Sequence, residues 1–151
     1  MLENEFSRLL AVELISHQPL RRQVRANSDE MRRLAQRFDL FKLDELQADL
    51  VIQYIADQEI EIKGIIAAKF EERHVKTLQP VPREIKKSFS LILGRHIPEG
   101  YDANEDHQGH RELLKDWVVG GQLDIGEIVV QELSDELDLY PGISDIIKPD
   151  S

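Results

Sequence analysis

Arginine side chains are concentrated in one short stretch of this chain, and their chemistry is that of phosphate binding. Residues 21–42 include seven basic and three acidic residues. A guanidinium group binds a phosphate through two parallel hydrogen bonds, so the stretch favours contact with a polyanion such as RNA. The candidate RNA-binding residues are Arg21, Arg22, Arg25, Arg32, Arg33 and Arg37. A solvated helix face whose arginines pair with nearby acids explains the same composition, and the sequence leaves both interpretations open.

Any RNA contact is expected to involve the RNA backbone. The chain has neither a Gly-x-x-Gly loop nor the aromatic motif with which RNA-binding sheets stack on bases. If about five phosphates were neutralised, the affinity for single-stranded RNA would fall with the logarithm of the salt concentration at a slope of about −3.5, from roughly −0.7 per contact. Recognition of a base sequence is therefore not predicted.

The carboxylates lie mainly in the second part of the chain. The formal net charge is −10, and residues 95–151 hold 14 acidic and 4 basic residues, whereas residues 1–94 hold 15 of each. Complementary potentials steer association, so the acidic part, from Glu99 to Asp138, is a candidate docking surface for a basic protein. Ordinary solubility explains surface acids as well. Because the Debye length is about 8 Å at physiological salt, the two charged regions are expected to act independently.

No metal or cofactor site is predicted. The chain contains no cysteine, which excludes disulfides, thiolate zinc sites and iron–sulfur clusters. The loop before His107 resembles the start of a calcium-binding loop, but His107 and Leu113 stand where such a loop needs glycine and glutamate. The remaining zinc candidates are His107 and His110 with Asp106 and Glu112, and a solvated polar loop explains them more simply.

An enzymatic function is not predicted either. The sequence has no glycine-rich phosphate loop, no Gly-x-Ser-x-Gly elbow and no defensible Ser/His/Asp set. Asp124 and Glu127 are a carboxylate pair of the kind that acid/base chemistry uses. Their spacing is also that of a helix capping box, in which each side chain satisfies an otherwise free amide. We therefore expect both residues to be structural.

Two amphipathic helices are expected to support these residues. Asn27 is a helix-capping residue type, and the first helix is predicted at residues 29–39, with apolar side chains along one side and arginines on the other. The second helix is predicted to start after Asp124 and to stop before Tyr140. A short helical turn is expected at residues 113–118.

A meander of strands is expected between the two helices. Apolar and polar residues alternate over residues 46–54 and again over residues 60–70, which predicts an antiparallel hairpin. Pro80 and Pro82 predict an interruption before a third long strand at residues 85–93. Shorter strands are expected at residues 6–12 and 22–26, and a loop is expected at residues 96–110.

The expected fold is a single α+β domain over residues 1–142, followed by a C-terminal tail at residues 143–151. We predict a curved antiparallel sheet of about five or six strands, with both helices covering its apolar side. A chain of 151 residues, of which 41% are hydrophobic, is long enough to bury a core. The chain starts with acidic residues, and no apolar run approaches the ~18 residues of a membrane span, so we expect a soluble cytoplasmic protein without a membrane partner.

Three short patterns of the chain resemble one known family. The first is the predicted helix followed by Leu43-Asp44-Glu45-Leu46, the second is His74-Val75-Lys76-Thr77-Leu78-Gln79-Pro80-Val81, and the third runs from Gly121 to Pro141. In this order they resemble the YceD family, also called large ribosomal RNA subunit accumulation proteins, and the resemblance covers nearly the whole chain. The matching positions are His74, Thr77, Leu78, Pro80, Gly121, Asp124, Glu127, Tyr140 and Pro141.

The resemblance implies a bacterial or plastid ribosome biogenesis factor that is required for normal levels of large-subunit (23S) ribosomal RNA. The expected partner is ribosomal RNA or a pre-ribosomal particle, and the acidic part of the chain adds a basic large-subunit ribosomal protein as a second candidate partner. Family members commonly carry cysteines where this chain has His74 and Thr77, so no metal or redox role is carried over. The alternative function is a protein-only assembly chaperone for a basic ribosomal protein, which never contacts RNA.

Overall fold

Long strands dominate the fold, which belongs to the α+β class. The computed structural model describes residues 6–56, 58–73, 76–95 and 110–139. In chain order the elements, with η for a single turn of 3₁₀ helix, are β1 (Leu9–Ala11), η1 (Val12–Leu14), β2 (Leu20–Arg25), α1 (Ser28–Arg37), β3 (Lys42–Ala56), β4 (Glu59–Arg73), β5 (Pro80–Gly94), β6 (His110–Leu113), η2 (Leu114–Asp116), β7 (Val118–Val119), β8 (Gln122–Asp124) and α2 (Ile125–Leu139).

Five strands form the larger sheet, in the order β2-β3-β4-β5-β6. Strands β3, β4 and β5 contain 15 residues each and pair antiparallel along almost their whole length, as predicted for the meander. The sheet is not antiparallel throughout, because β6 runs parallel to β5. The long connection between Gly94 and His110 allows this arrangement, since a parallel neighbour needs a crossover of about a dozen residues or more.

The period-two pattern of the long strands places their apolar side chains on one face of the larger sheet. On β3, Leu46, Leu50 and Ile52 are at most 1% exposed. The register pairs Leu50 with Gly64 and Ile52 with Ile62 on β4, and such cross-strand partners share a face. We call this the inner face and the opposite one the outer face.

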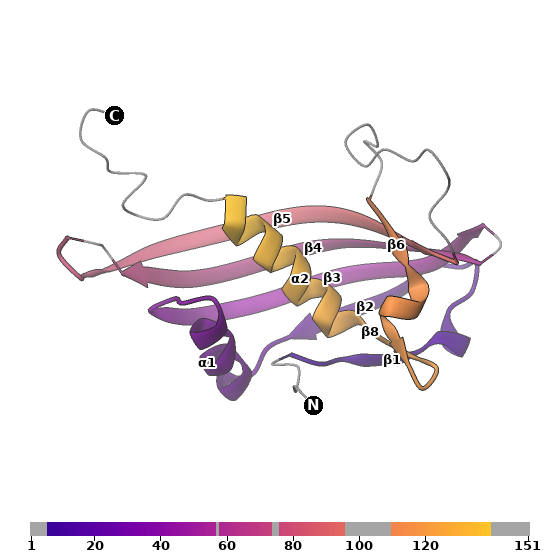
Figure 1. The fold of residues 1–151 in the computed structure, drawn as a ribbon, viewed down its shortest axis with the longest axis horizontal. Helices are drawn as coiled ribbons and strands as arrows, with labels where there is room; N and C mark the ends of the chain where they lie inside the picture. Colours follow the sequence, from indigo (N-terminus) through magenta and orange to yellow (C-terminus); the bar gives the residue numbers. More distant parts are fainter. Residues whose placement is uncertain (1–5, 57, 74–75, 96–109, 140–151) are drawn as a thin grey trace.

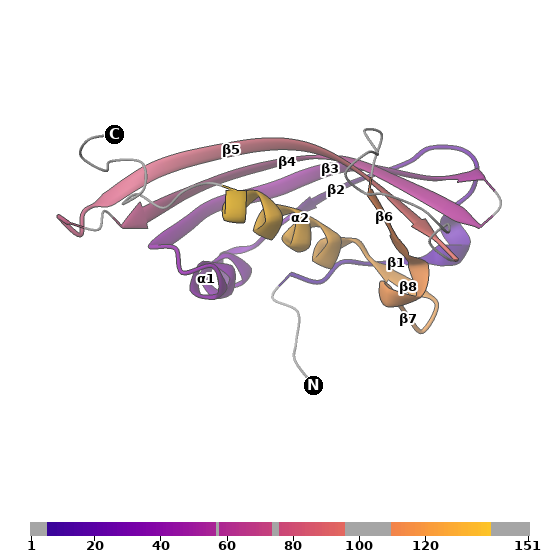
Figure 2. The ribbon, with the colours of Figure 1, turned by 45° about the horizontal axis from the view of Figure 1, so that its top comes forward.

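Both helices and the smaller sheet lie on the inner face. Figure 1 shows α2 running across the long strands, and Figure 2 shows the larger sheet arching over α1, α2 and the smaller sheet. The core fills the space between these layers and includes Phe6, Leu34, Leu123 and Ile128, each at most 1% exposed. The prediction that two helices cover the apolar side of a curved sheet is confirmed, and neither helix covers the outer face.

Helix α1 begins where its composition indicates. The Asn27 side chain accepts a hydrogen bond from the Glu30 N–H at 2.8 Å, and the Glu30 carboxylate accepts one from the Asn27 N–H at 2.9 Å, so the two form a capping box. The helix ends at Arg37, two residues before the predicted end. The reason is Asp39, whose φ of 56° is left-handed and turns the chain toward β3.

The predicted interruption at Pro80 and Pro82 is wrong, because β5 already starts at Pro80. On one side β5 pairs with β4 from Pro80 onward, whereas on the other side β6 pairs only with residues 91–94. In the described part of the chain, the proline end of β5 therefore has a neighbouring strand on one side only. A proline, which has no N–H to donate, is tolerated at such an edge.

The structure contains a second sheet, which the sequence did not predict. It has three strands in the order β1-β8-β7, and each neighbouring pair is antiparallel. Gly120 and Gly121 join β7 to β8 with φ values of 60° and 76°, the left-handed pair that a two-residue type I′ hairpin turn requires. Strands of two or three residues show no detectable alternation, so the sequence predicts only β1, within the longer strand expected at residues 6–12.

Candidate nucleic-acid interface

The six candidate arginines are all exposed, but they do not form one surface. Arg21 and Arg25 on β2 point to the outer face, and Arg22 between them points the other way, because side chains alternate along a strand. The other three lie on α1, on the inner side of the sheet (Figure 2), and are Arg32, Arg33 and Arg37. Strand alternation and the reversal of the chain into α1 therefore divide the six candidate arginines between separate surfaces.

The arginines of α1 match an ordinary solvated helix face. Asp29 forms ion pairs with Arg32 and with Arg33, the latter at 2.9 Å. The guanidinium carbon of Arg37 lies 5.6 Å from the centre of the Phe38 ring. Exposed pairs of this spacing contribute only about 0.3–0.5 kcal/mol each. Asp29 nevertheless cancels part of the positive charge that an RNA phosphate would meet here.

Two lysines join Arg21 and Arg25 on the outer face. Arg21 and Lys63 lie in one cross-strand row, on either side of Val51. Arg25 and Lys86 lie in another row, with β3 and β4 between them. All four side chains are exposed. We call Arg21, Arg25, Lys63 and Lys86 the basic band.

Sequence reasoning missed both lysines of the basic band. Neither lies near the arginine-rich stretch, and only the β2–β3–β4–β5 register brings them beside it. The sequence contains one indication that Lys63 is exposed, because Lys63 occupies a polar position in the alternation of the second predicted strand. That position predicts an outward side chain, but it does not predict which strand lies next to it.

An open hollow of about 560 Å³ lies within the basic band. Its apolar lining includes Val51 and Ile65, and Ile65 is 46% exposed. Arg21 and Lys63 line the same hollow together with Asp49. The arrangement offers an apolar contact next to positive charge, which suits a ligand that combines a planar or apolar group with an anion.

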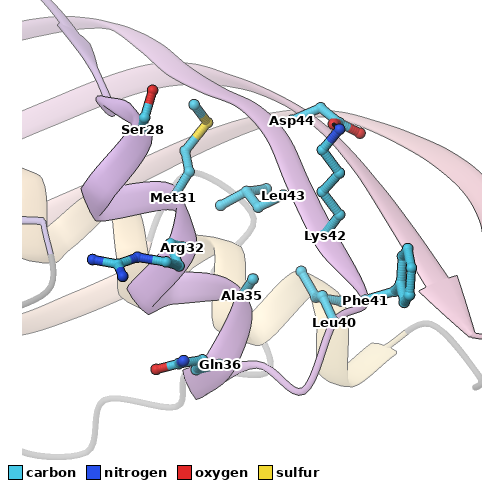
Figure 3. A pocket seen from close by; sticks show the side chains of 10 residues that line it. All are labelled: Ser28, Met31, Arg32, Ala35, Gln36, Leu40, Phe41, Lys42, Leu43 and Asp44. Carbon is cyan, nitrogen blue, oxygen red and sulfur yellow. Dashed lines mark ion pairs between the residues drawn. The ribbon is translucent and has the colours of Figure 1, made fainter.

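A second hollow, of about 550 Å³, separates α1 from the start of β3 (Figure 3). Met31 of α1 and Leu43 of β3 supply apolar walls. The Lys42 ammonium lies 3.1 Å from the Asp44 carboxylate, and this hydrogen bond raises the pKa of Lys42. Because Lys42 and Arg32 both have an acidic partner, this hollow has little net charge to attract a polyanion.

A polar cluster around Arg8 joins three segments and is structural. Arg8 donates two hydrogen bonds of 2.7 Å to the Glu30 carboxylate and one of 2.8 Å to the Arg25 carbonyl. The Arg8 hydrogen bond, and after it the one from the Asn27 N–H, hold the pKa of Glu30 below its usual range, although burial acts to raise it. The carboxylate therefore stays ionised and fixes Arg8 to α1, while Arg8 itself contacts β2 through the Arg25 carbonyl.

Three positions that carry the family resemblance have structural roles beside α2. Gly121 occupies the left-handed turn of the small sheet. Asp124 Oδ1 accepts hydrogen bonds from the Glu127 N–H at 3.1 Å and from the Arg8 N–H at 2.9 Å, so Asp124 caps α2 as predicted. Glu127 Oε2 accepts instead from the Gln131 side chain at 2.9 Å. These residues shape the fold and are not placed at the basic band.

The other positions of the resemblance lie elsewhere. Thr77 and Leu78 belong to the connection between β4 and β5, and Pro80 starts β5. Leu78 is 60% exposed and has a left-handed φ of 60°. The positions outside the described residues are His74, Tyr140 and Pro141.

The acids of α2 are partly used inside the fold. Lys87 on β5 lies 3.2 Å from the Glu132 carboxylate and 3.9 Å from that of Glu136, and it also donates to the Glu132 carbonyl at 3.0 Å. These contacts bind α2 to the inner face of the larger sheet. Much of the remaining acidic stretch, residues 96–109, lies outside the described residues.

The described residues contain no group of three or more histidine, aspartate and glutamate side chains that is arranged to hold a metal ion. The zinc candidates His107 and Asp106 lie outside these residues, and of His110 only the backbone is described. Within the same ranges, no helix has both the length and the apolar character that crossing a bilayer requires.

Comparison of the chain with protein families, with curated proteins and with solved structures found no match. The resemblance to the YceD family therefore remains a prediction from three sequence patterns.

Proposed function

We propose that this protein is a non-enzymatic ribosome biogenesis factor that supports the accumulation of large-subunit (23S) ribosomal RNA and contacts RNA directly. One observation carries the RNA contact, namely that four exposed basic side chains gather on a sheet face that neither helix covers. A polyanion is attracted by such a local positive surface even when the whole chain is acidic, because salt screens the distant charges. The family resemblance supports the choice of ribosomal RNA.

The chemistry of the outer face favours recognition of the RNA backbone. The outward positions of the described strands β2, β3, β4 and β5 carry no aromatic side chain. A sheet that reads single-stranded RNA by stacking presents such side chains on its exposed face. The affinity is therefore expected to come mainly from phosphate contacts and to fall with salt.

The alternative of a protein-only assembly chaperone has less support. It relies on a free acidic surface, yet Glu132 and Glu136 of α2 face Lys87 within the fold. It also gives the basic band no ligand. Crosslinking in cells distinguishes the two functions, because recovery of a basic ribosomal protein without attached RNA supports the chaperone, whereas attached ribosomal RNA supports direct contact.

Removal of the gene tests the role in ribosome biogenesis. We expect fewer large subunits on sucrose gradients and less 23S ribosomal RNA relative to small-subunit RNA, and a plasmid copy of the gene should restore both. An unchanged ratio of subunits and of their RNAs rules out the proposed role.

A further inference from the structure

We infer that single-stranded RNA lies across the outer face of the larger sheet, with its phosphates held by the basic band and one nucleotide seated against Ile65. This inference rests on the proposed function and adds to it the binding face and the class of ligand. It places the RNA on the side of the sheet opposite α1, although α1 carries half of the candidate arginines.

The pairing of the charged side chains favours the outer face over α1. The three neighbouring cross-strand rows that span the basic band contain four basic side chains and one acid, Asp49, among the described residues, and Glu61 of the next row pairs with Lys63, which leaves a net charge of +2. Helix α1 contains three arginines and Asp29, while the Glu30 charge is neutralised by Arg8, which leaves a net charge of +2. Asp29 pairs with two of the α1 arginines, whereas Arg21 and Lys86 of the basic band make no ion pair in the described part of the chain, so the band offers more of its positive charge to a polyanion.

The cations of the basic band are available to phosphates. In the described part of the chain, the side chains of Arg21 and Lys86 make no ion pair. Lys63 Nζ lies 3.9 Å from Glu61, and the Lys63 side chain is 63% exposed, so this pair is weak. Arg25 donates to a neutral side-chain amide at 3.0 Å, a partner that a phosphate can replace with a stronger bond.

The hollow within the band supplies a contact that does not depend on charge. Its volume of about 560 Å³ falls in the range of roughly 300–1,000 Å³ that small-molecule sites occupy. Ile65 lies in the row between the two pairs of cations and is 46% exposed. A base or a ribose over Ile65 removes this apolar surface from water without requiring a particular base.

The spacing of the band indicates an extended ligand instead of a single anion. Neighbouring strands lie about 4.8 Å apart, so the backbones at Arg21 and Lys63 are roughly 10 Å apart and those at Arg25 and Lys86 roughly 14 Å apart. These separations place the four side chains on different phosphates. A free phosphate contacts only one or two of them.

The test measures binding of a fluorescent oligouridine of about 15 nucleotides, near the upper end of the site sizes of single-strand-binding folds. Fluorescence anisotropy with the full chain is recorded over a series of salt concentrations. For four phosphate contacts, the logarithm of the wild-type affinity should fall with the logarithm of salt at a slope of about −2.8, from about −0.7 per contact.

Two double variants separate the two basic surfaces. The variant with Lys63→Glu and Lys86→Glu should bind at least about tenfold more weakly and show a slope of about −1.4 or less steep, since two contacts are lost. The matched control with Arg32→Glu and Arg33→Glu should keep the wild-type slope. Lys63→Gln with Lys86→Gln removes the charges without adding repulsion and gives the same direction of change if the glutamate variant folds poorly. The substitution Ile65→Ala should weaken binding without changing the slope.

Three other outcomes would contradict the binding face, the direct RNA contact or the class of ligand. If the α1 variant loses binding and the lysine variants keep it, the inference is wrong and the proposed function stands. If the wild-type chain does not bind the oligouridine, both the inference and the direct RNA contact are wrong, while the gene-removal experiment still tests the role in ribosome biogenesis. If polyglutamate competes as well as RNA of equal charge, the ligand is an acidic protein and the assignment to RNA is wrong.

Discussion

Glu30 of α1 binds the N-terminal segment through the side chain of Arg8. It is 8% exposed, and its carboxylate accepts two hydrogen bonds from Arg8 and one from the Asn27 N–H. The Arg8 hydrogen bond is the main cause of its lowered pKa. A carboxyl group whose pKa is lower in the folded state stabilises the fold above its unfolded-state pKa and loses this contribution as the pH falls through the folded value.

Substitution of this carboxylate should therefore have a pH-dependent effect. We expect Glu30→Gln to lower the free energy of unfolding at pH 7 by about 1–2 kcal/mol, because charge-assisted hydrogen bonds become neutral ones. Urea denaturation at several pH values should show the difference from the wild type shrinking in acid, where the wild-type carboxylate is also protonated. Glu84→Gln, at an exposed acid of β5, is the control and should stay within about 0.5 kcal/mol of the wild type. A difference that does not change with pH would contradict the role given to the charge.

Gly126 lets the N-terminal segment pass directly against the first turn of α2. A Cβ at this position would meet the Phe6 carbonyl oxygen and lie 2.8 Å from the Arg8 nitrogen, and both are backbone atoms. We expect Gly126→Ala to lower the free energy of unfolding by about 2 kcal/mol, although alanine is favoured over glycine in a helix by about 1 kcal/mol. Gly64→Ala is the comparison, because its Cβ would meet side chains, which can rotate, and we expect a smaller loss in urea denaturation. A stabilised Gly126→Ala would show that the segment is not packed there.

At the scale of elements, the alternation of β5 gives two neighbouring lysines opposite roles. Lys87 is 18% exposed and bound to Glu132 and Glu136 of α2, whereas Lys86 is exposed on the outer face. We expect Lys87→Met to lower the free energy of unfolding by about 1–2 kcal/mol, because two carboxylates lose their cation. Lys86→Met should stay within about 0.5 kcal/mol of the wild type. Hydrogen exchange should show faster exchange of the α2 amides in Lys87→Met alone, and equal exchange in both variants would contradict the assignment.

The long strands could be predicted because each repeats its alternation over 15 residues. Strands β7 and β8 have only two and three residues, too few to show a period. Pro80 and Pro82 misled the prediction because proline argues against a central strand but not against an edge, and a sequence does not reveal which strand lies at an edge. The direction of β6 likewise depends on the path of the chain after Gly94.

Half of the basic band could be predicted, since Arg21 and Arg25 belong to a local cluster of arginines. Lys63 and Lys86 could not, because they meet these arginines only through the pairing of four strands. The arginines of α1 belong to the same cluster in the sequence, but the Asp29 carboxylate forms ion pairs with two of them. The sequence therefore shows which charged residues are close along the chain, and the sheet register decides which of them lie on one surface.

At the scale of the whole molecule, one core joins the two sheets and both helices. The cluster of buried side chains includes Phe6 before β1, Leu123 of the smaller sheet and Leu50 of the larger one. The same N-terminal segment binds Glu30 through the Arg8 side chain and Asp124 through the Arg8 N–H. A shared core favours a single cooperative unfolding transition, as expected for the one domain predicted at residues 1–142.

Two optical probes and one core substitution test whether the domain unfolds in a single transition. Trp117, the only tryptophan, packs against the core beside the smaller sheet, so its fluorescence reports on that region, while far-ultraviolet circular dichroism reports on the helices and the long strands together. Both probes should give the same urea midpoint in the wild type. Phe6→Ala should lower both midpoints together, with a loss of about 3–5 kcal/mol, because Phe6 is fully buried. Leu78→Ala, at an exposed position, should leave both midpoints unchanged. If Phe6→Ala moves the fluorescence midpoint alone, the smaller sheet unfolds independently, and the N-terminal segment stabilises only that sheet.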